Sequence, residues 1–310
     1  MTVAARRSPA ALLAELSRLS DDPLAQARLA AEILGTERRA QLVGPALAVL
    51  EETPLPEARP ALLRLYADLD ADGVRRDAGG TFRAAALRAL RPWVTVDELP
   101  LLERAVTTYE FLPPGRSEEA TPIRAAGLVA MDDLDPELAG FHAARLLADV
   151  GHTSRLSGEP AKTAAGVLAA RSELLALYLC VLAGRQVDDV IAECLRHLAG
   201  APDGIARELC ERFGRDAGEA VQLGLIDMLL ARPDRPLFQR ELRARLRGAG
   251  SLTVLRYLAV TLVASRRPEL VAEVIAAARE ERDPGRSTAL AEGLALLPGG
   301  RSAADKPSPR

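Results

Sequence analysis

Residues 121–150, TPIRAAGLVAMDDLDPELAGFHAARLLADV, decide the fold of this chain. Thr121 and Pro122 read as a helix start, because an oxygen that can cap free N–H groups precedes a residue fixed near helical φ. Asp135-Pro136 ends this helix and starts a second one. Each helix has one apolar or small-residue face, at 123, 126, 127, 130 and 134 and at 138, 139, 142, 143, 146 and 150. The stretch predicts a helical hairpin that needs neighbours on both sides.

A small-residue motif in this hairpin occurs three times, at intervals of about 40 residues. It reads AAAL at 84–87, AAGL at 125–128 and AAGV at 164–167. Small residues let two helices approach closely, and the Leu or Val that follows fills the layer between repeats. By period and packing pattern the chain resembles the HEAT-repeat superfamily. The resemblance implies an all-α protein, a right-handed α-α superhelix built as a solenoid of antiparallel helix pairs.

The expected organisation is a disordered segment at 1–7, one solenoid domain at 8–297 and a disordered Gly/Pro-rich tail at 298–310. Ser8-Pro9 and Asp22-Pro23 predict the first two helix starts. Thr36 is expected to cap a third segment that breaks near Gly44-Pro45. No stretch alternates with period two for long enough to predict a strand.

Composition limits the class of protein. The chain is 48% hydrophobic but only 3% aromatic, which is typical of close-packed helices rich in Ala and Leu. A net charge of −3 argues against a protein that is basic overall. The N-terminus lacks the apolar core of a signal peptide, and the longest apolar run, 174–183, cannot span a bilayer. We therefore expect a cytoplasmic protein without a membrane partner.

Three long polar loops, 70–80, 112–120 and 151–158, recur at the repeat spacing and should project from the same edge of a solenoid. Their side chains are mixed in sign and short of apolar residues. The alternative is that the loops are solvated insertions without a role. The candidate partner-binding residues in them are Arg75, Arg76, Arg116, Glu118, Glu119, His152 and Arg155.

Charge is distributed unevenly along the sequence. Residues 232–267 contain nine arginines and two acids, and Arg240, Arg243 and Arg247 share one helix face, so they are candidate polyanion-binding residues. Residues 97–137 contain ten acids and three arginines. Such runs are also what ordinary solvated helix faces look like.

Catalytic and metal-binding patterns are not evident in the sequence. His142 lies on an apolar helix face and is expected to be a core residue, while Asp132, Asp133 and Asp135 are explained by helix capping. No two histidines have metal-ligand spacing with a third donor, and the nucleotide-binding and nucleophile motifs are missing. Cys180, Cys194 and Cys210 have no CxxC pair and are expected to be buried, without a metal or a disulfide.

We therefore expect a non-enzymatic scaffold or adaptor, without cofactor or metal, that binds a protein partner through its concave face and the ridge formed by the three long loops. The alternative is a nucleic-acid-binding protein that uses the basic C-terminal repeats. Some HEAT-like proteins that excise alkylated bases from DNA work in this way, although this chain has a single tryptophan, Trp93. Bilin-lyase-type HEAT proteins are a further possibility without a positive feature in the sequence.

Overall fold

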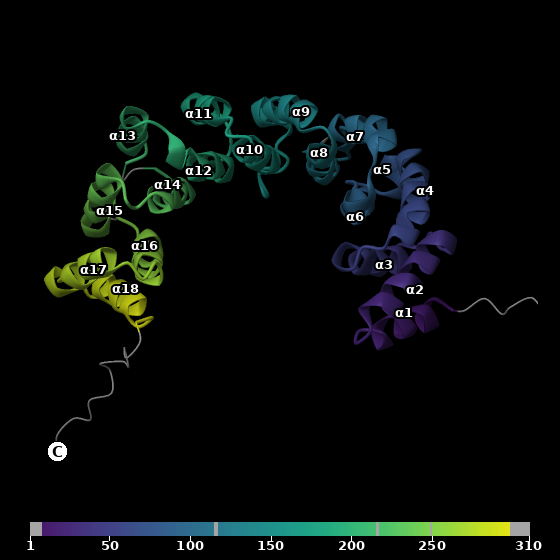
Figure 1. The fold of residues 1–310 in the computed structure, drawn as a ribbon, viewed down its shortest axis with the longest axis horizontal. Helices are drawn as coiled ribbons and strands as arrows, with labels where there is room; N and C mark the ends of the chain where they lie inside the picture. The colour runs from purple at the N-terminus through teal and green to yellow at the C-terminus, as the bar shows by residue number, and fades with distance from the viewer. Residues whose placement is uncertain (1–7, 115–116, 215–216, 249, 298–310) are drawn as a thin grey trace, which may run out of the picture. The chain divides into compact units, whose positions relative to one another are not determined.

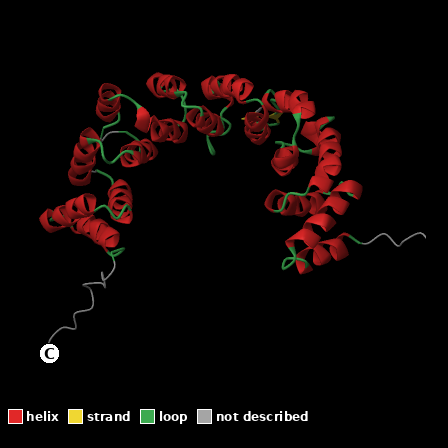
Figure 2. Cartoon of the chain, in the orientation of Figure 1, coloured by secondary structure: helices red, strands yellow, loops and turns green. Residues whose placement is uncertain are grey.

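The computed structural model describes residues 8–114, 117–214, 217–248 and 250–297. In this part of the chain there are eighteen α-helices and one antiparallel pair of two-residue strands (Figure 2). The expected all-α class is confirmed, whereas the right-handed superhelix stays a prediction. The chain divides into two compact units, residues 1–171 and 172–310, which are described separately.

The first unit contains ten α-helices and both strands among its described residues. The helices are α1 (Pro9–Arg18), α2 (Pro23–Thr36), α3 (Ala40–Glu52), α4 (Arg59–Asp70), α5 (Gly73–Arg76), α6 (Thr81–Leu90), α7 (Leu99–Val106), α8 (Thr121–Leu134), α9 (Pro136–Ala148) and α10 (Ala161–Ala170). The strands are β1 (Phe111–Leu112) and β2 (Ser117–Glu118), with Phe111 opposite Glu118. Short 3-10 turns cover Pro56–Ala58, Arg91–Trp93, Val96–Glu98 and Val150–His152.

The helices of the first unit form two layers. In one layer α3, α6, α8 and α10 each contact the next (Figure 1). In the other layer, α2 packs on α3, α4 on α6, α7 on α8, and α9 on both α8 and α10. The three small-residue motifs fall on α6, α8 and α10, three neighbours in one layer. The repeat of about 40 residues in the sequence therefore corresponds to the move from one helix of this layer to the next.

Gly127 lies at a close approach between helices, as its place in the motif predicts. A Cβ atom added there would lie 2.8 Å from Ala105 Cβ on α7, closer than real Cβ atoms come. The corresponding Gly166 on α10 has open space around it. Both helices carry the motif, but its glycine lies close to a neighbouring helix only on α8.

Helix starts agree with the sequence in some places and differ in others. Ser8, Asp22 and Asp135 each cap a helix as predicted. The predicted break at Gly44-Pro45 is wrong, because α3 continues through the proline. Buried residues on both sides of it, Leu42 and Leu47 among them, hold that helix against α2 and α6.

Two threonines predicted to cap helices do not do so. Thr36 is the last residue of α2, and its hydroxyl donates to the Glu32 carbonyl at 3.0 Å within the same helix. Thr121 is already the first residue of α8, and the residue before it, Ala120, occupies the cap position. Glu118 Oε1 accepts the Ala120 N–H at 2.8 Å, so a loop carboxylate binds the backbone at this helix start.

The second unit repeats the two-layer plan with shorter connections. Its helices are α11 (Leu174–Ala183), α12 (Asp188–Arg196), α13 (Asp203–Arg212), α14 (Glu219–Ala231), α15 (Pro236–Gly248), α16 (Leu252–Ala264), α17 (Pro268–Glu280) and α18 (Pro284–Leu294), with a 3-10 turn at His197–Gly200. One layer consists of α12, α14, α16 and α18, each in contact with the next, and α11, α15 and α17 pack against it. α13 lies against α15.

Candidate functional site

A buried arginine fastens the first long loop, 70–80, to the helix that follows it. Arg83 of α6 is 1% exposed, and its guanidinium lies 2.7 Å from Glu110 Oε1 and 3.2 Å from Asp77 Oδ2. Asp77 also accepts backbone N–H groups from the first turn of α6. Asp70 lies 3.4 Å away. Because a buried charge without partners is strongly unfavourable, these carboxylates are held in place, and the loop with them.

A second buried arginine does the same for the other two loops. Arg124 of α8 is fully buried, and its guanidinium forms an ion pair with Glu118. It also donates to the carbonyl oxygens of Thr108 and His152, at 2.8 Å each. Its planar group stacks over the Tyr109 ring, 4.3 Å from the centroid. One side chain therefore connects α8 to residues before the second loop, inside it and inside the third.

These two arginines share a sequence pattern. Asp77 precedes Arg83 by six residues, and Glu118 precedes Arg124 by the same number. Each arginine stands directly before a small-residue motif. In the third copy of the motif this place is taken by Thr163. An acid six residues before an arginine, found twice at the repeat spacing, was the available signal.

His152 joins the second and third loops through a polar and aromatic cluster. Its Nδ1 lies 2.8 Å from Asp149 Oδ1, and Tyr109 Oη donates to Asp149 Oδ2 at 2.7 Å. Its ring meets those of Tyr109 and Phe111 edge-on, with centroids 5.0 and 5.8 Å apart. Burial alone would raise the pKa of Asp149, but the hydrogen bonds with Tyr109 and His152 outweigh it and lower that pKa.

Together these contacts place the three loops side by side. We call residues 70–80, 111–120 and 150–158 the loop edge, of which 115 and 116 lie outside the described residues. A Cβ atom added at Gly79 of the first loop would lie 3.6 Å from Glu119 Cβ of the second. The second and third loops meet through Phe111, Arg124 and His152. The loops thus recur on one edge of the first unit, as their spacing predicts.

The predicted partner-binding residues divide by exposure. Arg75, Arg76, Glu119 and Arg155 are exposed, and His152 is half-buried. The Glu118 side chain is only 4% exposed and is bound by Arg124, so its role in the fold is to fasten the loop. Arg116 lies outside the described residues.

The loop edge carries more exposed apolar surface than its sequence suggests. Leu156 is 96% exposed, Phe111 49%, Val74 45% and Val150 37%. These four are among the eleven large apolar side chains that are exposed in the described part of the chain. Val74 lies on the short helix α5 within loop 70–80. Phe111 is exposed because neighbouring residues of a strand point to opposite sides, and Leu112 takes the more buried one.

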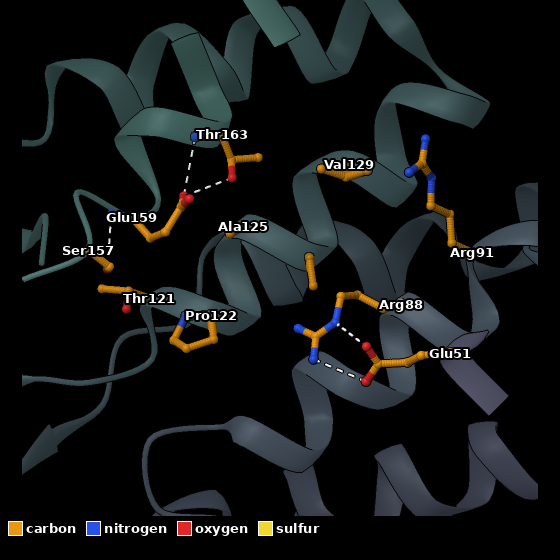
Figure 3. Close-up of a pocket in the computed structure, with 11 residues that line it drawn as sticks. Glu51, Arg88, Arg91, Thr121, Pro122, Ala125, Val129, Ser157, Glu159 and Thr163 are labelled. Carbon is orange, nitrogen blue, oxygen red and sulfur yellow. Dashed lines mark hydrogen bonds and ion pairs between the residues drawn. The ribbon is translucent and has the colours of Figure 1, made fainter. Parts of the chain in front are cut away.

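A groove of about 640 Å³ lies beside the loop edge, across α8 (Figure 3). Its apolar lining comes from α8: Pro122, Ala125, Ala126 and Val129. On one side Arg88 is paired with Glu51 at 2.8 Å, and on the other Glu159 accepts hydrogen bonds from Thr163 (Figure 3). The Arg91 guanidinium is paired with Asp133 at 2.6 Å. The charged groups that line the groove already have partners within the fold.

The candidate polyanion-binding arginines of α15 are partly neutralised by the helix packed beside them. Arg243 lies 2.8 Å from Glu273 of α17, and Arg247 lies 3.7 Å from Glu273 and 3.8 Å from Glu280. Arg240 is exposed. The count of nine arginines over 232–267 left out these acids, because they follow later in the sequence.

The expected core histidine is not in the core. His142 is only half-buried on α9, with Nδ1 3.4 Å from the Arg145 guanidinium, and burial together with that charge lowers its pKa. Its helix face is apolar but partly open to solvent. In the acidic cluster, Asp135 caps α9 as predicted and Asp133 pairs with Arg91.

Cys194 and Cys210 are buried and Cys180 is half-buried, and all three are free thiols. Burial raises the pKa of Cys210 to about 11. Among the residues that the structure describes, no group of three His, Cys, Asp or Glu side chains is arranged to hold a metal ion. Within the same residues, none of the helices has the length and apolar character needed to cross a membrane.

Comparison with known proteins gives no match to a family model, a curated protein or a solved structure. Inferences about function therefore depend on the geometry of the chain itself.

Proposed function

We propose that the first unit is a binding module for a protein partner and that the loop edge is its recognition surface. The observation that carries this proposal is the construction of the edge. Three long loops are fastened side by side by two buried arginines, and each loop leaves at least one large apolar side chain exposed. Single exposed apolar residues are ordinary on protein surfaces, whereas their grouping on a built structure favours a contact surface.

The energetics of the two arginines support this reading. Burying a guanidinium with carboxylates stabilises a fold little compared with apolar residues of the same volume. What such a pair does supply is a defined geometry for the loops. A preorganised surface loses less conformational entropy when a partner binds.

The groove across α8 supports the same function in a secondary role. It adjoins the third loop through Ser157 and Glu159, and its apolar lining suits a segment of the partner that extends beyond the edge. Since its charged groups are already paired, we assign the larger share of the binding energy to the loop edge.

The test compares two double variants, each of which removes two exposed apolar side chains from the first unit. Phe111→Ser with Leu156→Ser changes the loop edge. Phe141→Ser with Val96→Ser changes side chains that are 72% and 73% exposed elsewhere. The control variant should keep the wild-type melting temperature. The loop-edge variant should lose at most about 1.5 kcal/mol of stability, because Phe111 also meets the His152 ring edge-on. Each chain is then used as bait in extract of the native host, with cross-linking and mass spectrometry.

We expect the loop-edge variant to lose about tenfold or more in capture of the wild-type partner, since truncating a central contact residue commonly removes 1–2 kcal/mol. The control variant should capture it normally. The proposal is wrong if the control loses the partner while the loop-edge variant retains it.

A further inference from the structure

We propose that the partner segment bound by the loop edge is an acidic peptide that carries aliphatic or aromatic side chains. This inference rests on the proposed function and adds the chemistry of the partner. It follows from which charges the fold buries at the edge and which it leaves in solvent.

The fold removes acids from the surface of the edge. The sequences of the loops are mixed in sign, but Asp77 is buried against Arg83 and Glu118 is buried against Arg124. Glu110, directly before the second loop, is also bound by Arg83. Each of these arginines is itself buried, so neither contributes an exposed positive charge in exchange.

The basic residues of the same loops stay in solvent. The Arg75 side chain is 85% exposed and has only a long 3.7 Å contact with Asp72. Arg76 is exposed and donates to a backbone carbonyl, that of Asp68, at 2.6 Å. Arg155 is exposed and forms no ion pair with any side chain that the structure describes. Against these three, Glu119 is exposed, and the Asp72 side chain is 42% exposed beside Arg75.

The acidic stretch at 97–137 does not reverse this balance. Asp132 and Asp133 belong to the last turn of α8, whose first turn adjoins the loop edge, so a helix rise of about 17 Å separates them from it. Asp97 precedes the start of α7, and it is the other end of this helix that leads into the second loop. The acids of this stretch therefore lie mostly away from the edge or inside the fold.

Exposed arginines beside exposed apolar side chains define the complementary ligand. Guanidinium groups bind carboxylates with directional, charge-assisted hydrogen bonds. Val74, Phe111 and Leu156 offer the apolar contacts that supply most of the affinity of a peptide interface. A segment in which Asp or Glu alternates with large apolar residues satisfies both.

The experiment is selection of random dodecamer peptides by phage display on the full chain, followed by fluorescence polarisation with the enriched peptides. Three chains are compared: wild type, a loop-edge reversal (Arg75→Glu, Arg76→Glu, Arg155→Glu) and a control reversal (Arg18→Glu, Arg28→Glu, Arg64→Glu). All six arginines are exposed residues of the first unit, so both variants change the net charge equally.

We expect enriched peptides with net negative charge and at least one Leu, Phe or Trp. Their Kd should rise about tenfold or more for the loop-edge reversal, about twofold or less for the control, and should rise with added salt. Phe111→Ser should also weaken the binding of the same peptides.

The two proposals fail in different ways. If the enriched peptides are neutral or basic but still lose binding to Phe111→Ser, the acidic chemistry is wrong and the loop edge remains the site. If the selected peptides bind the loop-edge variants as tightly as wild type, or if none depends on the edge, the proposed function is wrong as well.

Discussion

Two arginine-rich regions of this chain pair arginines with acids, but one buries the pairs and the other leaves them partly exposed. At the loop edge of the first unit, Arg83 and Arg124 are buried and bind carboxylates of long loops. On α15 of the second unit, Arg243 and Arg247 are half-exposed and pair with acids of the neighbouring helix. The difference teaches that the number of charges in a segment says little about its surface, because burial and the next helix decide which charges remain.

The largest expected effect comes from breaking the buried pairing in α6. Arg83→Met should destabilise the first unit by about 3–5 kcal/mol, because Asp77 and Glu110 would stay buried without their partner. Arg88→Met on the same helix removes an exposed pair with Glu51 and should cost at most about 1 kcal/mol. Urea unfolding of both variants measures the contrast, and similar losses would contradict the distinction between buried and exposed arginines.

A smaller effect is expected from the close helix approach at Gly127. Gly127→Leu should destabilise by roughly 1–3 kcal/mol, since the added atoms must enter the contact with Ala105. Gly166→Ala, at the corresponding place on α10, should stabilise by about 0.5–1 kcal/mol, because the site has space and alanine favours a helix. Thermal unfolding distinguishes them. A melting temperature for Gly127→Leu equal to that of wild type would show that the contact is looser than described.

The pH dependence of stability should contain a contribution from Asp149, which directly precedes the third loop. Its pKa is lowered in the folded state, so its contribution is present above the ordinary carboxylate pKa near 3.9 and is lost as the pH falls through the lower folded value. Asp149→Asn should therefore flatten the loss of stability on acidification. Chemical denaturation at a series of pH values below about 5 measures this. An unchanged acid profile in the variant would remove Asp149 as a contributor.

The smallest effect belongs to the basic surface of the second unit. We expect the wild-type chain to bind polyanions weakly at low salt, because Glu273 and Glu280 already occupy Arg243 and Arg247. Glu273→Gln with Glu280→Gln should strengthen that binding, whereas Arg243→Ala with Arg247→Ala should weaken it and change stability by less than about 1 kcal/mol. Gel shifts with duplex DNA at low salt test both. Binding that the glutamate variants leave unchanged would show that these acids do not mask the surface.

Much of the helical plan could be predicted from the sequence because it is local. The AAGL motif and the Asp135-Pro136 start each indicate a helix from a few neighbouring residues. Pro45 was misread because tertiary packing holds α3 together across a residue that usually ends a helix.

The candidate site was predictable only in part. The repeat spacing placed the three loops on one edge. It could not show that Glu118 is buried by Arg124 or that Phe111 and Leu156 are exposed, because spacing does not specify which side chains of a loop turn inward. The six-residue spacing of acid and arginine was visible in the sequence, and its meaning became clear from the buried pairs.

Hydrogen exchange of the free chain tests the central claim most directly, namely that buried arginines fasten the loops into one ordered edge. In wild type, the N–H groups of Glu119 and Ser154, which donate to Glu110 and Glu159 carbonyls, should exchange far more slowly than in an unfolded chain. In Arg124→Met these two should lose protection while the amides in the last two turns of α3 keep theirs. The account is contradicted if these loop amides of the wild-type chain exchange as fast as in an unfolded chain while the helix amides remain protected.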